Sequence, residues 1–512
     1  MYLKTFPFSK ILFAGCFLMI SANTFSQKIG IFDGQTDIGK VLHKGSANYN
    51  PSSQDYSISG SGANIWFTND EFHFVWKKMK GDFIVHARGK FLAKAMEEHR
   101  KFGWMIRQSL DTSSKMIAAT VHGNGLTSLQ YRTAPHTNVE EKQFDIKGSD
   151  VIQLERKGNE FIMSVAHFGD TLVSQEISNV DFDGDVYVGL FVCAHNKDAI
   201  EKVAFENVRI VIPASKDLVP YRTYLGSHME TMDVMTGKRK IIYSENASLQ
   251  APNWMKDGKS LIYNSRGSLY RLNLKNRKPV LLPTGKVKDI NNDHVISFDG
   301  KMLGISAVSP DGKIGSTVYT LPITGGEPKL ITPLLGFSYL HGWSPDGKWL
   351  TYTGKRNNDP TPAGFDIYKI PSQGGKEIQL TNVTGLDDGP EYSPDGKYIY
   401  FNSVRSGLMQ LWRMKPDGSD PEQLTNDDYN NWFAHVSPDG KWIVCISFLK
   451  DEVKPDDHPF YKHVYLRMMP VNCGPLKVIA YLYGGQGTIN TPSWSPDSKK
   501  IAFVSNTDMS TE

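Results

Sequence analysis

Histidine and acidic side chains recur at one place in the second half of the chain, shortly before copies of a repeated turn sequence. His294, His341 and His435 lie four or five positions before the aspartate of such a turn, and Glu391 lies four positions before another. Imidazole nitrogens and carboxylate oxygens bind divalent metals, and the same groups transfer protons as general acids and bases. If the turns occupy equivalent places in a repeated fold, these side chains converge.

The turn reads Ser-Pro-Asp-Gly-Lys or a close variant, and we count six copies, with aspartates at positions 257, 299, 346, 395, 439 and 497. Proline presets φ for a tight turn and Asp-Gly tolerates left-handed backbone, so the sequence suits a reversal between two strands. Apolar, strand-like residues follow, as in Trp-Leu-Thr-Tyr-Thr at 349–353. A strand-rich repeat of about 40–50 residues predicts the blades of a β-propeller.

These repeats resemble the TolB-like (PD40) propeller repeat over residues 221–506. With six copies we expect six blades. The sixth repeat leaves room for only two inner strands before Glu512, so outer strands must come from elsewhere. The run at 229–243 has two apolar segments around a Thr-Gly turn, and we expect it to complete the last blade and remove an open sheet edge.

Residues just before each innermost strand line one mouth of a propeller channel, which predicts a polar ligand site there. We expect catalytic roles for Asp388, Glu391 and His435, and one divalent metal ion held by His294, His341 and His435. Further ligand contacts are expected from the mouth loops and from two arginines after second strands: Asn431, Trp432, Gln486, Asn490, Arg356 and Arg405. The alternative is that the polar groups only cap strand ends and bind channel water, and that the arginines form surface ion pairs.

Oligogalacturonate lyases are similar in using a TolB-like propeller, with a metal held by histidines and a glutamine. His341, His435 and Gln486 stand in loosely comparable loops, and this resemblance implies β-elimination beside a uronate carboxylate. The segment 456–463, with His458 and His463, is an insertion that could fold over the mouth or form an exposed loop. A polysaccharide lyase or glycoside hydrolase is therefore expected. A peptidase is not, because no Gly-x-Ser-x-Gly elbow or α/β-hydrolase domain is found.

Residues 28–213 carry short strand-like runs separated by Gly and Asn or Asp turns, which predicts a β-sandwich. The runs at 76–83, 99–108 and 122–132 resemble concanavalin A-like jelly rolls of the DUF1349 type, and the resemblance implies a carbohydrate-binding or accessory domain. Trp66, Trp76 and Arg107 are expected to face a glycan, although the tryptophans equally suit a core and the arginine a surface. The expected fold is all-β: a jelly-roll β-sandwich at 28–213, then a six-bladed β-propeller at 221–512.

The N-terminal residues have the pattern of a secretory signal peptide. Lys4 and Lys10 precede an apolar stretch at 11–20, and small and polar residues follow. We expect cleavage after a signal peptide at 1–26 and a periplasmic or extracellular location. The apolar stretch is too short to span a membrane, and it continues past Cys16, which argues against a lipid anchor there.

Charge and cysteine content limit the classes of binding partner and the disulfide bonds that we expect. The net charge is +3, with acidic and basic residues interspersed, so nucleic acid is not expected. No other apolar segment has the length of a membrane span. Cys193, Cys445 and Cys473 are an odd set without regular spacing, which argues against a disulfide framework. The expected partner is a glycan or small polar ligand; the alternative, implied by the TolB resemblance, is a non-catalytic scaffold that binds another envelope protein.

Overall fold

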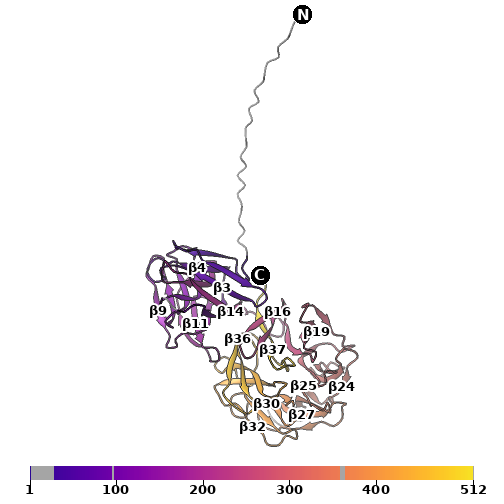
Figure 1. Cartoon of the computed structure of the whole chain (residues 1–512). Coiled ribbons are helices and arrows are strands. Elements are labelled where there is room, and N and C mark those ends of the chain that lie inside the picture. The colour runs from indigo at the N-terminus through magenta and orange to yellow at the C-terminus, as the bar shows by residue number, and fades with distance from the viewer. Residues whose placement is uncertain (2–27, 95–96, 358–363, 511–512) are drawn as a thin grey trace.

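A computed structural model describes Met1 and residues 28–94, 97–357 and 364–510. The predicted signal peptide and Cys16 lie outside the described residues. The regular structure of the described residues is β-strand, as the predicted all-β class requires, and none of it is a helix long and apolar enough to cross a membrane. Two domains follow one another, formed by β1–β14 and by β15–β37 (Figure 1).

The N-terminal domain consists of two seven-stranded antiparallel sheets. One has the order β1 (Gly34–Ile38), β4 (Phe72–Met79), β13 (Val186–Cys193), β6 (Lys101–Arg107), β7 (Met116–His122), β8 (Thr127–Arg132), β9 (Glu140–Gln143). The other has the order β12 (Val173–Ile177), β11 (Glu160–Ala166), β10 (Val151–Lys157), β5 (Phe83–Phe91), β14 (Glu201–Val211), β3 (Asp55–Gly60), β2 (Ser46–Asn50). Buried side chains of both sheets, such as Trp104 and Ile152, share one apolar core, so the sheets form a sandwich. Its concanavalin A-like character stays a prediction.

Five blades of the C-terminal domain are four-stranded sheets in chain order. The first is β17 (Gln250–Trp254), β18 (Ser260–Ser265), β19 (Ser268–Asn273), β20 (Pro279–Leu281), and the second is β21 (Ile290–Ile296), β22 (Met302–Ala307), β23 (Thr317–Pro322), β24 (Lys329–Leu330). The third is β25 (Gly336–Trp343), β26 (Trp349–Arg356), β27 (Asp366–Pro371), β28 (Ile378–Gln379). The fourth is β29 (Asp387–Tyr392), β30 (Ile399–Ser403), β31 (Gln410–Met414), β32 (Glu422–Gln423), and the fifth is β33 (Tyr429–Val436), β34 (Trp442–Leu449), β35 (Lys462–Pro470), β36 (Lys477–Gly484).

The repeated turn joins the first two strands of a blade through side-chain hydrogen bonds. In the third blade Ser344 Oγ donates to Asp346 Oδ1 at 2.7 Å, and the Trp349 amide donates to Ser344 Oγ at 2.9 Å. Gly347 has φ +73°, which glycine adopts without strain. A further copy at 309–313 makes the same serine–aspartate bond but connects β22 to β23, so it marks no additional blade.

The sixth blade is closed by strands from both ends of the domain, and the predicted closure and blade count are confirmed. Its sheet has the order β16 (Arg239–Glu245), β15 (Gly226–Asp233), β37 (Lys500–Thr507), with Met229 opposite Val504. A single bridge from Trp494 to Ile501 adds the inner strand. The described cysteines Cys193, Cys445 and Cys473 are free thiols, as expected, and the first two are buried.

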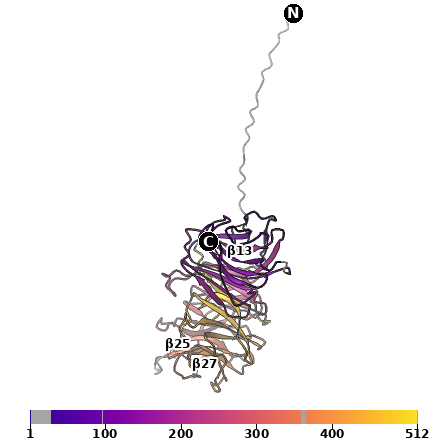
Figure 2. The same ribbon diagram turned by 90° about the vertical axis from the view of Figure 1, so that its left-hand side faces the viewer.

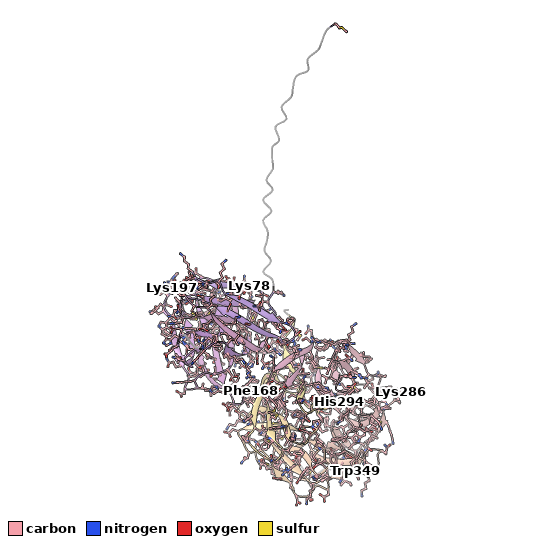
Figure 3. The ribbon with its side chains drawn as sticks, viewed as in Figure 1. Lys78, Phe168, Lys197, Lys286, His294 and Trp349 are labelled. Atoms are coloured by element: carbon pink, nitrogen blue, oxygen red, sulfur yellow. The ribbon has the colours of Figure 1, made fainter. Side chains whose placement is uncertain are left out.

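The sixth blade and the fifth blade both contact the sandwich. Glu230 on β15 accepts hydrogen bonds from Arg209 of the sandwich at 2.6 Å and from Arg239 of β16 at 2.5 Å, and the three side chains are buried. In Figure 2 the sandwich lies directly against the propeller, and Figure 3 places Phe168 at this contact. The Phe168 ring, which belongs to the sandwich, packs against an apolar cluster that includes Tyr465 and Tyr481 of the fifth blade. Buried ions and packed rings hold the two domains together.

Candidate functional site

A cavity of about 940 Å³ opens at the end of the propeller where the innermost strands begin. Its polar wall includes Asp293 on β21, His341 on β25 and Asp388 on β29. Six aromatic side chains also line it, together with amide groups such as those of Gln250, Asn264 and Gln486; the aromatic residues are Tyr221, Tyr224, Tyr339, Phe365, Phe433 and Phe460. Concave, largely apolar surfaces with a few convergent polar groups are typical of ligand sites.

His341 and Asp388 form a buried pair in this wall. Nε2 of His341 lies 3.2 Å from Oδ1 of Asp388, which also accepts hydrogen bonds from Thr353 Oγ1 and the Gly389 amide, both at 2.7 Å. Burial opposes ionisation of both groups, but their mutual contact outweighs it. The pKa of His341 is therefore raised, and that of Asp388 is lowered to about 2. The pair favours an imidazolium beside a carboxylate.

Asp293 is a second carboxyl group in the cavity wall. Its side chain is buried, and it has no side-chain hydrogen bond to the described residues. Burial and the neighbouring Asp388 raise its pKa to about 6, although His341 opposes the rise. The sequence predicts a role for His294 rather than for Asp293. Successive strand residues point to opposite faces, so Asp293 lines the cavity while its neighbour points into the propeller.

Two distant segments roof the cavity. Tyr221 and Tyr224 belong to the linker between the domains, and Phe460 belongs to the insertion of the fifth blade. The Phe460 ring lies 5.1 Å from that of Tyr221 and 5.6 Å from that of Tyr224. The Leu225 amide donates to Tyr461 Oη at 3.0 Å, which ties the two segments together. The insertion therefore folds over the mouth and is not a free loop.

Glu391 and His435, expected beside Asp388, lie outside the cavity lining. Nδ1 of His435 is 2.7 Å from Oε2 of Glu391, and its Nε2 is 2.5 Å from the Ile489 carbonyl oxygen. Both ring nitrogens are thus occupied, and both residues are buried. The Phe433 ring, which lines the cavity, contacts the rings of His341 and His435. Of the three expected catalytic residues, the structure exposes Asp388 to the cavity.

The three expected metal-binding histidines have separate surroundings. His294 is fully buried inside the propeller (Figure 3), and burial lowers its pKa to about 4. His341 contacts Asp388, whereas His435 contacts Glu391. Over the described residues, no group of three His, Cys, Asp or Glu side chains is arranged to hold a metal ion. The geometry therefore does not fit a metal held by these histidines, and metal binding stays a prediction.

Among the other mouth residues, Gln486 lines the cavity. Its Oε1 accepts a hydrogen bond from Nδ2 of the buried Asn490 at 2.9 Å, so Asn490 positions Gln486. Asn431 and Trp432 are fully buried in the fifth blade. Asn431 Oδ1 accepts from Ser447 Oγ at 2.7 Å, and the Trp432 ring lies 4.3 Å from that of His458. Through His458, Trp432 supports the cavity wall from behind.

The expected arginines form ion pairs away from the cavity. Arg356 pairs with Glu377 at 2.6 Å and Arg405 with Asp387 at 2.7 Å. In the sandwich, Arg107 is fully buried and pairs with Asp70 at 2.7 Å.

The two expected sandwich tryptophans pack against apolar groups. Trp66 and Trp76 are partly buried against one apolar cluster, and Trp76 has an edge-on contact with Tyr187. These contacts match the core alternative left open by the sequence.

Comparison with known proteins places the chain among propellers. The model of the TolB β-propeller domain (PD40) matches residues 312–454. The uncharacterized protein Atu1656 of Agrobacterium fabrum is 44% identical over 279 residues, which cover 54% of this chain and 92% of that protein. A solved structure of a putative TolB from Agrobacterium tumefaciens is 44% identical, with a TM-score of 0.52, and covers 56% of this chain and 99% of its own.

The propeller of an oligogalacturonate lyase from Vibrio parahaemolyticus is far more distant. It is 13% identical, with a TM-score of 0.36, and the match covers 57% of this chain and 99% of the lyase. That likeness is too low to carry an argument about activity. The close relatives, together with the six blades and their repeated turns, establish that the chain belongs to the TolB-like β-propeller family.

Proposed function

We propose that this chain is an exported saccharide-binding protein, acting in the periplasm or outside the cell, whose ligand occupies the cavity at the propeller mouth. The observation that carries the proposal is the meeting of aromatic walls with the buried polar groups of Asp293, His341 and Asp388. Aromatic faces pack against the C–H faces of sugar rings, while carboxylates accept hydrogen bonds from hydroxyl groups. The volume of about 940 Å³ suits a short saccharide.

The His341–Asp388 pair is the part of the cavity best suited to proton transfer. Asp388 holds the imidazole in place, and the pair faces the ligand volume. Glu391 and His435 are bonded to each other and to backbone groups. Cleavage of a bound glycan, by hydrolysis or by elimination, would therefore use His341 and Asp388.

Calorimetric titration of the full chain with mono- and disaccharides tests the proposal. We expect binding that His341→Gln weakens by about tenfold or more, because a charge-assisted contact is lost. His167→Gln, at an exposed position of the sandwich, is the matched control and should bind like the unchanged protein. Repeating the titration with a chelator and then with divalent metal tests the predicted metal ion. The proposal fails if no saccharide binds.

A non-catalytic scaffold is the second candidate, and its support is the 44% identity to a structure described as a putative TolB. Such a protein would bind an envelope protein partner through the propeller surface. The scaffold function would be favoured if the His341→Gln variant still binds an envelope protein and the unchanged protein binds no saccharide. Saccharide binding lost in His341→Gln would favour the first.

A further inference from the structure

The charged side chains around the mouth cavity are predominantly acidic. Asp293 and Asp388 are buried in its wall, and Asp289 and Asp456 are exposed at its opening. Among the described lining residues Arg266 is the one side chain with a permanent positive charge, and it is 69% exposed. The cavity lining therefore carries more carboxylate groups than permanent positive charges, and its one arginine is largely exposed.

The surplus is clearest at the buried end. A protonated His341 compensates Asp388, from which its Nε2 is 3.2 Å away. Asp293 has no such partner: it is 6% exposed, lines the cavity, and makes no side-chain hydrogen bond to the described residues. Burial lowers the pKa of His458, so that imidazole adds no charge near neutral pH. Two carboxylates and one imidazolium leave the cluster one cation short.

We infer that the ligand supplies this missing cation, and that it is an amino sugar whose protonated amine lies against Asp293 and Asp388. The inference rests on the proposed saccharide site and narrows its substrate class. Buried carboxylates are stabilised when a cation pairs with them, and an ammonium group donates up to three hydrogen bonds. The Tyr339 and Phe433 rings in the same wall add the attraction of aromatic faces for a cation.

The same charges disfavour an acidic sugar. A uronate would bring a further carboxylate beside Asp293 and Asp388 in a site where burial weakens screening. No lining lysine, and no lining arginine other than the exposed Arg266, is found among the described residues to pair with it. A neutral sugar would fill the volume but leave Asp293 without a partner. An amino sugar is therefore favoured over acidic and neutral sugars, because only its amine can pair with Asp293.

Titration of the full chain at neutral pH with chelator present tests the inference. The probes are glucosamine, N-acetylglucosamine, glucose and glucuronic acid, together with the same four forms of galactose, so that only the substituent changes. We expect each free amine to bind at least tenfold more tightly than its acetylated and neutral counterparts, with the uronic acids weakest. Equal or tighter binding of neutral or acidic sugars would overturn the inference and leave the saccharide site standing. Absence of binding by every sugar would overturn both.

Two variants locate the amine. Asp293→Asn keeps the shape of the side chain and removes its charge, so the ratio of glucosamine affinity to glucose affinity should fall by about tenfold or more. Asp428→Asn, at an exposed carboxylate 3.1 Å from Lys450 and away from the cavity, is the matched control and should keep the preference. If Asp293→Asn does not fold, Asp388→Asn takes its place.

An unchanged preference in the folded variant would show that the amine lies elsewhere and would overturn the inference. A divalent metal ion is the competing cation. If added metal abolishes the amine preference and allows uronic acids to bind, the missing cation is the metal and the inference is wrong.

Discussion

Nε2 of His341 lies 3.2 Å from Oδ1 of Asp388, and the two residues come from neighbouring blades. The pair therefore exists only when β25 and β29 are in register within the closed ring. Thr353 Oγ1 and the Gly389 amide fix the same carboxylate oxygen. The Asp388 side chain thus holds His341 in the cavity wall and also joins the third blade to the fourth.

Removing the Asp388 carboxylate should destabilise the protein. Asp388→Ala leaves the Thr353 hydroxyl, the Gly389 amide and His341 without their acceptor, and a buried unpaired donor costs about 1–3 kcal/mol. Asp388→Asn retains an acceptor oxygen and should lose less. Urea denaturation of both variants measures the difference, and equal losses would contradict the role of this oxygen.

Asp293→Asn should have the opposite effect on stability. Burial raises the pKa of Asp293 to about 6, so its ionised form is disfavoured in the folded state at neutral pH. Because one pKa unit corresponds to about 1.4 kcal/mol, the neutral amide should stabilise the fold by on the order of 1–3 kcal/mol at pH 7. The gain should shrink as the pH falls below about 6 and be lost below 3.8, the ordinary value, where the carboxyl is protonated in both states. Thermal unfolding at several pH values checks this, with Asp428→Asn as control.

Glu230→Gln should weaken the domain contact strongly. Its carboxylate is buried between Arg209 and Arg239, and breaking a buried ion cluster by removing one partner costs about 3–5 kcal/mol. The matched control is Asp420→Asn, which breaks the exposed 2.6 Å pair with Lys415 and should cost less than about 1 kcal/mol. Limited proteolysis and chemical denaturation measure both. Similar losses in the two variants would show that the cluster is not a structural anchor.

The contact between domains should also weaken in alkaline solution. His463 of the propeller lies 3.2 Å from Glu155 of the sandwich and 3.7 Å from Glu452. Burial opposes its protonation, but the two carboxylates reverse this and raise its pKa. Its contribution to stability should therefore be complete below about pH 6.5, the ordinary imidazole value, and be lost as the pH rises through the higher pKa of the folded state. The difference in melting temperature between the unchanged protein and His463→Gln should accordingly vanish at high pH.

The fold was accessible from sequence because its strongest signal is local. Each Ser-Pro-Asp-Gly-Lys turn makes its own hydrogen bonds, as Ser344 and Asp346 show, so the repeat is visible without knowledge of tertiary contacts. The same local signal does not show that the further copy at 309–313 joins the second and third strands of a blade. The shortfall of strands after the sixth copy likewise predicts the closure by β15 and β16.

The site was harder to predict from the sequence, because it depends on the direction of each side chain and on segments that lie far apart in the chain. Position relative to the turn selects both Asp293 and His294, and strand alternation decides which of them lines the cavity. The residue type of His435 predicts a ligand contact, but its two ring nitrogens contact Glu391 and a backbone carbonyl. Above the cavity Tyr221 contacts Phe460, which lies more than two hundred positions later in the chain. No local sequence pattern predicts such a contact.

Closure of the sixth blade has a consequence for the order of folding. β15 can pair with β37 only after β37, the last of the described strands, has been synthesised. The strands of the sandwich are complete some three hundred residues earlier. Domains generally fold as units during synthesis, so the sandwich can be native before the ring exists. The propeller surface around Glu230, which contacts the sandwich, is complete only when β37 is in place, because Ser505 of β37 donates to the Glu230 carboxylate at 2.7 Å. Docking of the two domains therefore follows synthesis of β37, and its rate reports ring closure.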